Sequence, residues 1–146
     1  MRYLFFGFVL SFASIVGLSD DKAPSTENGW VKFIAKDAIA SGKMDSEVTL
    51  FNRKRVDLLS RSHAVECDWA YKWSEGVGQS LYYAAVTHRK AGLLLLLRND
   101  DDLRYVDQAL VITRRNDPPI DVLVYDCRKQ DFVFVAARSL GHFMED

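Results

Sequence analysis

Two spacings of hydrophobic residues alternate along the chain and predict its secondary structure. Apolar residues three or four positions apart predict helices over residues 30–41 and 70–89, and a third helix that begins near Asp101 and ends before Pro118. Apolar residues at every second position predict strands over residues 47–51, 55–59 and 64–69. The uninterrupted apolar run at 91–97 predicts a strand covered on both faces, and two last strands are expected over residues 120–127 and 132–137.

The order of these segments predicts the class of fold. Helix, three strands, helix, strand, helix and two strands indicate a three-layer α/β/α domain with a central mixed sheet. A chain of 146 residues has room for one such domain and a short appendage. We therefore expect a single domain over residues 30–146. The polar segment 20–29, which contains Pro and Gly, is expected to be a linker.

Residues 1–19 are expected to be a targeting segment. Arg2 is followed by an uncharged, mostly apolar run that ends at Ser19, which is the pattern of a secretory signal peptide. This predicts an exported protein, periplasmic or secreted, without stable membrane contact once the segment is removed. A short membrane anchor is the alternative, although the run is short for a span of roughly 20 residues. A buried helix and a wrongly assigned start codon are further alternatives.

Charge and cysteine content narrow the function only a little. The formal net charge is −1, and it becomes −2 if residues 1–19 are removed, whereas proteins that grip duplex DNA through many phosphates are usually basic. Local basic clusters at 53–55, 88–90, 114–115 and 128–129 are typical of solvated loops as well as of binding surfaces. Cys67 and Cys127 are either two unpaired thiols or, in an oxidising compartment, a disulfide. The acidic run 99–102 is expected to cap a helix rather than to bind calcium.

The hairpin around the turn 60–63 places charged residues opposite one another. Counting outward from this turn puts Asp57 opposite Glu66 and Arg55 opposite Asp68, all on one face of the sheet. Opposed residues in antiparallel strands have Cβ atoms roughly 4.5–5.5 Å apart, so the two facing carboxylates repel. A divalent cation between them would remove this conflict, and Mg²⁺ is commonly held by one or two carboxylates with water and phosphate.

The following helix adds polar groups along one stripe. Lys72, Gly76, Gln79 and Tyr83 follow at helical spacing. An ammonium group close to a metal-bound water could position that water for attack on a phosphodiester. An exposed lysine with no catalytic role is the alternative.

The segment RVDLLSRSHAVECDWAYKWSEGVGQSLYYA resembles the PD-(D/E)XK nuclease superfamily. This resemblance implies a restriction-endonuclease-like fold and a nuclease that uses Mg²⁺ or Mn²⁺ on nucleic acid, DNA rather than RNA. It implies that Asp57 and Glu66 bind the metal, that Gln79 and Tyr83 are the helix pair, and that Glu47 is the upstream acid. The resemblance spans about residues 47–97.

One position departs from the superfamily pattern. The lysine that usually stands two residues after the second acid is replaced by Asp68, so Lys72 is the expected substitute and Asp68 becomes a possible metal ligand. Alternatively, Arg55 could simply neutralise Asp68 across the hairpin in a surface ion pair. Two functions follow as hypotheses. The first is an active metal-dependent nuclease, and the second is an inactive α/β module that keeps the fold and binds a partner.

Overall fold

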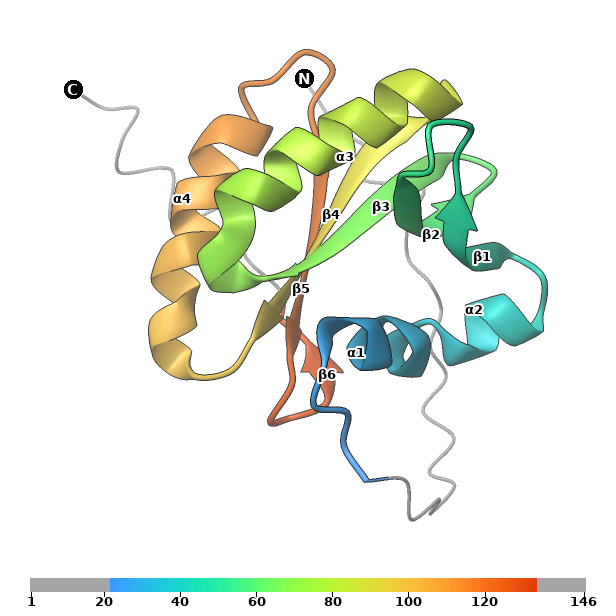
Figure 1. Cartoon of the computed structure of the whole chain (residues 1–146). Helices are drawn as coiled ribbons and strands as arrows, with labels where there is room; N and C mark the ends of the chain where they lie inside the picture. The colour runs from blue at the N-terminus through green and yellow to red at the C-terminus, as the bar shows by residue number, and fades with distance from the viewer. Residues whose placement is uncertain (1–21, 134–146) are drawn as a thin grey trace, which may run out of the picture.

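The protein is an α/β structure with a six-stranded mixed sheet and four helices, seen in a computed structural model that describes residues 22–133 (Figure 1). The predicted targeting segment 1–19 lies outside the described residues, as does the end of the last predicted strand beyond residue 133. Within residues 22–133, no helix is both long enough and apolar enough to cross a membrane.

The elements follow the predicted order. The helices are α1 (Glu27–Ile34), α2 (Lys36–Ala40), α3 (Trp73–Thr87) and α4 (Leu103–Thr113), with short 3-10 turns at Ala70–Lys72 and Asp100–Asp102. The strands are β1 (Met44–Thr49), β2 (Arg55–Ser60), β3 (His63–Trp69), β4 (Lys90–Leu97), β5 (Asp121–Asp126) and β6 (Asp131–Phe132).

The strands lie side by side in sequence order, from β1 to β6. Neighbouring strands at both ends are antiparallel, whereas β3, β4 and β5 run parallel to one another. The connections β3–α3–β4 and β4–α4–β5 are the helical crossovers that parallel strands require. The sheet is therefore mixed, as the alternation of segments predicts.

Helices cover both faces of the sheet, because the strand β4 is apolar on both sides. Leu93, Leu95 and Leu97 pack with α3 and α4, whereas Leu94 and Leu96 pack with α1 and α2. All five of these leucine side chains are at most 2% exposed. The run at 91–97 is thus a central strand, as predicted from its continuous hydrophobicity.

Three local predictions need correction. The first helix begins at Glu27 instead of residue 30, with the Thr26 side chain accepting a hydrogen bond from Gly29 N, and it breaks at Ala35 into α1 and α2. Three residues of the expected linker are therefore helical. The turn before α4 is capped by Asn99, whose side chain accepts a hydrogen bond from Asp102 N, so the run 99–102 caps the helix as expected, but α4 itself begins at Leu103 and not near Asp101. The first strand begins at Met44, three residues before its predicted start.

Candidate functional site

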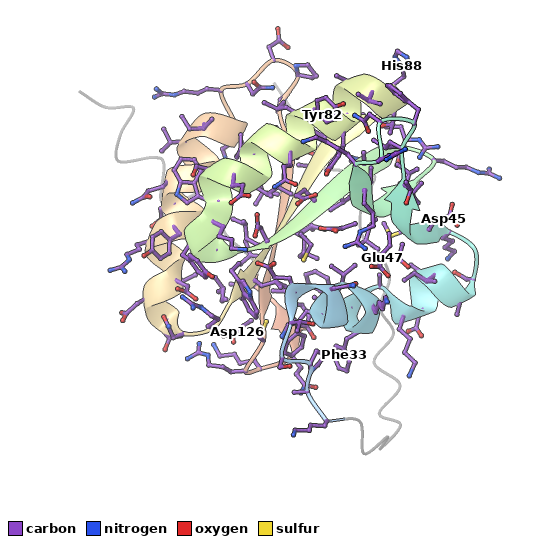
Figure 2. All side chains as sticks on the ribbon, viewed as in Figure 1. Phe33, Asp45, Glu47, Tyr82, His88 and Asp126 are labelled. Carbon is purple, nitrogen blue, oxygen red and sulfur yellow. The ribbon has the colours of Figure 1, made fainter. Side chains whose placement is uncertain are left out.

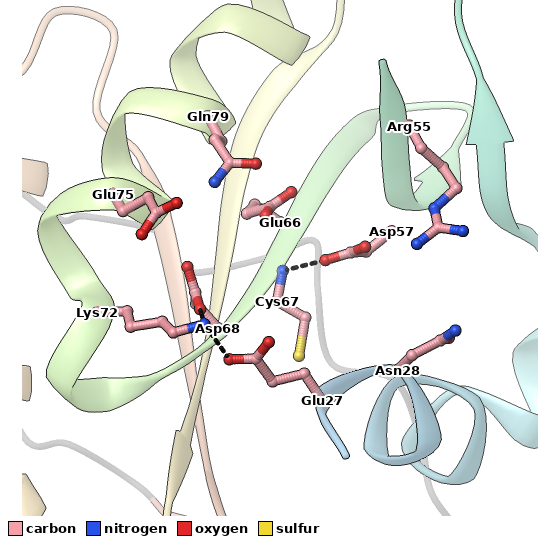
Figure 3. Close-up of a pocket in the computed structure, with 10 residues that line it drawn as sticks. All are labelled: Glu27, Asn28, Arg55, Asp57, Glu66, Cys67, Asp68, Lys72, Glu75 and Gln79. Atoms are coloured by element: carbon pink, nitrogen blue, oxygen red, sulfur yellow. Dashed lines mark hydrogen bonds and ion pairs between the residues drawn. The ribbon is translucent and has the colours of Figure 1, made fainter. Parts of the chain in front are cut away.

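A pocket of about 250 Å³ collects most of the predicted site residues (Figure 3). It lies between β2, β3, the first turn of α1 and the beginning of α3. Five carboxylates and two cations line it. The lining residues are Glu27, Asn28, Arg55, Asp57, Glu66, Cys67, Asp68, Lys72, Glu75 and Gln79.

The pocket exists because β2 and β3 separate. The predicted register is confirmed next to the turn, where Leu59 pairs with Ala64 and Leu58 pairs with Val65. The ladder stops there. In place of a further backbone pair, the Asp57 carboxylate accepts a hydrogen bond from Cys67 N, with Oδ2 at 2.9 Å. A side chain thus takes the position of a strand carbonyl, and the gap beyond it forms the pocket.

Separation of these strands also ends the regular alternation of side chains along β2. Regular alternation would put Val56 and Leu58 on the same face, but Val56 packs with Tyr83 of α3 while Leu58 belongs to the core under α1. Asp57, between them, points into the pocket, as do Glu66 and Asp68 from β3 (Figure 3). These three acids line the same pocket, but Asp57 and Glu66 are not the directly paired residues of a continuous ladder that counting from the turn predicts.

The surroundings of Glu66 disfavour its ionised form. Its side chain is buried, and Oε2 has no hydrogen-bond partner among residues 22–133. Burial, followed by the nearby carboxylates of Asp57 and Asp68, raises the pKa of Glu66 to about 9. Desolvation and like charge both disfavour the ionised form. At neutral pH this carboxyl group holds its proton unless a cation enters the pocket.

Asp68 and Lys72 form a second group with Glu27. Lys72 Nζ lies 3.1 Å from Glu27 Oε1 and 3.6 Å from Asp68 Oδ1. Burial, together with the adjacent Glu27 carboxyl, raises the pKa of Asp68 to about 7, and Lys72 acts in the opposite direction. The hydrogen bond to Glu27 raises the pKa of Lys72, which keeps the ammonium charged. Glu27 also accepts a hydrogen bond from Trp69 N at 3.3 Å.

Gly76 explains how α3 comes so close to these acids. A Cβ atom at this position would lie 2.8 Å from Leu93 Cδ1 and 3.4 Å from Asp68 Oδ2. A side chain there would therefore push α3 away from β3 and β4. The side chains of Leu93 and Asp68 occupy the space beside Gly76.

The helix pair has one member in the pocket and one behind it. Gln79 lines the pocket, and its Oε1 accepts a hydrogen bond from Tyr83 OH at 3.4 Å. Tyr83 is 4% exposed and packs with Val56 and Ala64, so it supports Gln79 from the protein interior. Burial raises the pKa of Tyr83, and the acids Glu66 and Asp57 raise it further.

The predicted roles of Arg55 and Glu47 need correction. Arg55 lines the pocket, but its Nη1 pairs with Glu47 Oε1 at 3.0 Å and does not pair with Asp68 as expected. Glu47 also pairs with Lys32 at 2.8 Å and accepts a hydrogen bond from Asn28. These partners lower the pKa of Glu47, with Lys32 and Asn28 contributing most. Glu47 is thus an ionised surface acid outside the pocket lining.

Sequence reasoning missed two acids of the pocket, Glu27 and Glu75. Glu27 was included in the expected linker, although Thr26 before it and the apolar residues after it form a helix-start signal. Glu75 lies three residues after Lys72, in the first turn of α3. That spacing places both side chains at the same end of the helix.

Neither a metal site nor a disulfide is preformed in the described part of the chain. Among residues 22–133, no three His, Cys, Asp or Glu side chains are grouped as a ready-made set of metal ligands. Asp57, Glu66 and Asp68 therefore line one pocket without forming a three-carboxylate cluster. Cys67 and Cys127 are free thiols. Burial raises the pKa of Cys67 well above its usual range, so the thiol next to the pocket is protonated.

No model of a known protein family, no curated protein sequence and no solved structure matches this chain.

Proposed function

We propose that this protein is a Mg²⁺-dependent phosphodiester hydrolase of nuclease type, acting on nucleic acid and preferring DNA. The single observation that supports this most strongly is Glu66, whose buried Oε2 lacks a partner among residues 22–133 at a wall shared with four other carboxylates. A buried polar atom without a partner is rare in native proteins and calls for an explanation. A divalent cation would satisfy Oε2 and cancel the repulsion between the acids.

Asp57 and Glu66 are the residues that would hold the ion, with Asp68 as an additional ligand. Two carboxylates are enough for Mg²⁺, which keeps several waters and takes further oxygens from the phosphate of the substrate. Mg²⁺ lowers the pKa of bound water and shields charge that develops on the phosphodiester. Mn²⁺ has the same preference for carboxylate and water ligands and is the alternative ion.

Lys72 and Gln79 would orient the reacting groups. The ammonium of Lys72 lies 3.6 Å from Asp68, the residue at the position where the PD-(D/E)XK pattern has its lysine. This short distance supports the idea that Lys72 replaces the missing lysine. Gln79 offers a donor and an acceptor to the pocket, and Tyr83 restrains its side chain. The mixed sheet with helices on both faces is compatible with the restriction-endonuclease-like fold proposed from the sequence.

An inactive binding module is the second candidate, and two observations favour it. The Lys72 ammonium is already paired with Glu27, and no three acidic, His or Cys ligands are grouped in residues 22–133. In this alternative, the pocket is the remnant of a catalytic site and the domain binds a partner. Export through residues 1–19, or anchoring to a membrane by them, remains a proposal under either function.

A cleavage assay with matched variants tests the proposal. Purified protein is incubated with circular single-stranded DNA, plasmid DNA or RNA in the presence of Mg²⁺, Mn²⁺ or EDTA. We expect cleavage with either metal and none with EDTA. Asp57→Asn and Glu66→Gln should each lower the rate by roughly 100-fold or more, since a metal ion contributes several kcal/mol to transition-state stabilisation. Asp45→Asn is the control, because Asp45 is an exposed acid of β1 outside the pocket.

The two candidates separate in the same experiment. Cleavage that survives both Asp57→Asn and Glu66→Gln would contradict the proposed site. Absence of cleavage on every substrate, together with no heat of Mg²⁺ binding in calorimetry, would favour the binding module.

A further inference from the structure

The loop between β1 and β2 carries exposed aromatic and basic residues above α3. Phe51 is 87% exposed, the largest value among the exposed large hydrophobic side chains of the described residues. Tyr82 of α3 is 38% exposed, and Lys54 Nζ lies 5.3 Å from the centre of its ring. Arg53 is exposed on the same loop. We call Phe51, Arg53, Lys54 and Tyr82 the hairpin platform; Figure 2 labels Tyr82 near the end of α3, beside this loop.

The platform is held in place although its side chains are exposed. Within the loop, Leu50 N donates to Lys54 O at 2.8 Å and Arg53 N donates to Leu50 O at 2.9 Å. Asn52 Oδ1 accepts a hydrogen bond from Lys54 N at 3.1 Å, and the Asn52 amide also donates to Tyr82 OH, which ties the loop to α3. An exposed phenylalanine on such a fixed loop adds little to folding, because its surface stays in water.

The platform is continuous with the acidic pocket along two elements. Along α3, Tyr82 follows the pocket residue Gln79 by three positions, a rise of about 4.5 Å. The rings of Tyr82 and Tyr83 have centres 5.8 Å apart, and Tyr83 donates to Gln79. Along β2, the pocket residue Arg55 directly follows Lys54. A ligand on the platform is thus about one helical turn from the pocket.

The pocket is acidic, whereas the hairpin platform is basic. Apart from the protonated Glu66, the pocket has four carboxylates against two cations, so it repels a polyanion. The platform has two cations, Arg53 and Lys54, and no acid. A nucleic-acid strand therefore needs the basic platform to approach the pocket. Aromatic rings and cations together suit a single strand, whose bases are free to stack while its phosphates contact Arg and Lys. In a duplex the faces of the bases are stacked on one another and cannot stack on protein rings. The net charge of −1 also does not favour binding to the many phosphates of a duplex.

We propose that the hairpin platform binds single-stranded nucleic acid, with bases stacked on Phe51 and Tyr82 and phosphates held by Arg53 and Lys54. This inference rests on the proposed nuclease function of the pocket and adds its substrate class. The platform binds the strand and leads it to Asp57 and Glu66, so single strands are the preferred substrate.

Binding without metal tests the platform independently of catalysis. Fluorescein-labelled dT15 and a 15-base-pair duplex are titrated with protein in EDTA, and anisotropy gives the dissociation constants. We expect dT15 to bind more tightly than the duplex. Phe51→Ala should weaken dT15 binding by roughly tenfold, the effect typical of one lost base–aromatic stack. Lys54→Ala should weaken binding and lower the slope of log K against log salt by about 0.7.

Two control variants separate these effects from a general change in the surface. Ile112→Ala removes an exposed apolar side chain of α4, and Arg115→Ala removes an exposed cation beyond the end of α4. Both should leave dT15 binding unchanged.

The outcomes for the platform and for the pocket are distinguishable. Three results would overturn the proposed role of the platform. They are tighter binding of the duplex than of dT15, equal effects of Phe51→Ala and Ile112→Ala, and no dT15 binding at 100-fold excess of protein. The last result would point to a protein partner for Phe51. If dT15 binds as expected but Mg²⁺ produces no cleavage, the platform stands and the nuclease proposal fails.

Discussion

Two buried carboxylates in this protein have opposite electrostatic surroundings. Asp126, at the end of β5, is 2% exposed, and Glu66 of β3 is 7% exposed. The pKa of Asp126 is lowered to about 2, chiefly by its hydrogen bonds to Arg128, whereas burial and neighbouring acids raise the pKa of Glu66 to about 9. Arg128 reaches Asp126 Oδ2 at 2.8 Å and Asp100 Oδ1 at 2.6 Å. Hydrogen-bond donors thus favour the ionised form of Asp126, and desolvation favours the protonated form of Glu66.

The difference indicates which acid serves the fold and which is available for a ligand. Asp126 accepts hydrogen bonds from the Arg128 backbone and side chain and from Lys129 N, so its interactions are complete within the chain. Glu66 lies in a pocket where acids outnumber cations, and its Oε2 has no partner in residues 22–133. A charge conflict left inside a pocket is typical of functional sites. Substitutions at these acids and at their partners therefore test the contrast between them.

Removing the partner of Asp126 should have the largest effect. Arg128→Ala leaves a buried carboxylate without its main donor, and we expect the free energy of unfolding to fall by about 2–3 kcal/mol. Urea denaturation at pH 7 measures the change. Lys129→Ala is the control, because Lys129 is 69% exposed and lies 3.6 Å from Asp126. If both variants lost the same free energy of unfolding, the Arg128 side chain would not be the group that stabilises the Asp126 carboxylate.

Removing the charge conflict at Glu66 should act in the opposite direction. The folded-state pKa of about 9 lies above the ordinary value of 4.5, so the folded protein binds an extra proton between these values and its stability falls as pH rises through this window. Without metal, Glu66→Gln should therefore raise the free energy of unfolding by about 1–3 kcal/mol at pH 9 and change it little near pH 4.

Urea denaturation in EDTA at both pH values measures this effect. Glu75→Gln, a change at an exposed pocket acid, should not alter the pH dependence in the same way. Parallel pH profiles for the unmodified protein and Glu66→Gln would show that Glu66 is not the group that titrates.

Metal binding should release a proton from the same carboxyl. At pH 7.5 a group with a pKa of about 9 is mostly protonated, and it must ionise to bind Mg²⁺. We expect about one proton to be released per ion, measured by calorimetry in two buffers that differ in ionisation enthalpy. Glu66→Gln should abolish the release together with most of the affinity. Tight binding without proton release would place the ion elsewhere.

The smallest effect is expected at the ion pair between Glu27 and Lys72. Both side chains are partly exposed, at 29% and 36%, and such pairs contribute about 0–1 kcal/mol. Glu27→Gln should therefore change the free energy of unfolding by less than about 1 kcal/mol. Glu47→Gln, at 24% exposure, is a control of the same kind. A loss of more than 2 kcal/mol in Glu27→Gln alone would make this pair part of the structural framework.

The order of elements and the register near the hairpin turn could be predicted because both depend on local signals. The apolar run at 91–97 becomes the central strand, and Leu59 pairs with Ala64 as counted from the turn. Apolar alternation fixes register in this way because a slip of one residue would expose the buried face. The same local patterns group Asp57, Glu66, Lys72 and Gln79 into one predicted site, and all four line the pocket.

The rest of the site could not be predicted because it depends on contacts distant in sequence. Counting along a hairpin assumes that the ladder continues, whereas Asp57 replaces the next backbone pair by a bond to Cys67 N. Glu27 meets Lys72 across 45 positions, which no periodicity reveals. Polar residues at the start of α1 have the composition of a linker, although polar residues are also what the first turn of a helix requires.

The bond from Cys67 N to Asp57 has a consequence for how tightly a ligand could be held. Oδ2 is bound to the sheet, so the Asp57 carboxylate is restrained where it lines the pocket. The conformational entropy of this side chain is therefore lost during folding, and little remains to be lost when an ion arrives. The same carboxylate thus closes the sheet where the ladder stops and forms part of the wall that a ligand would meet.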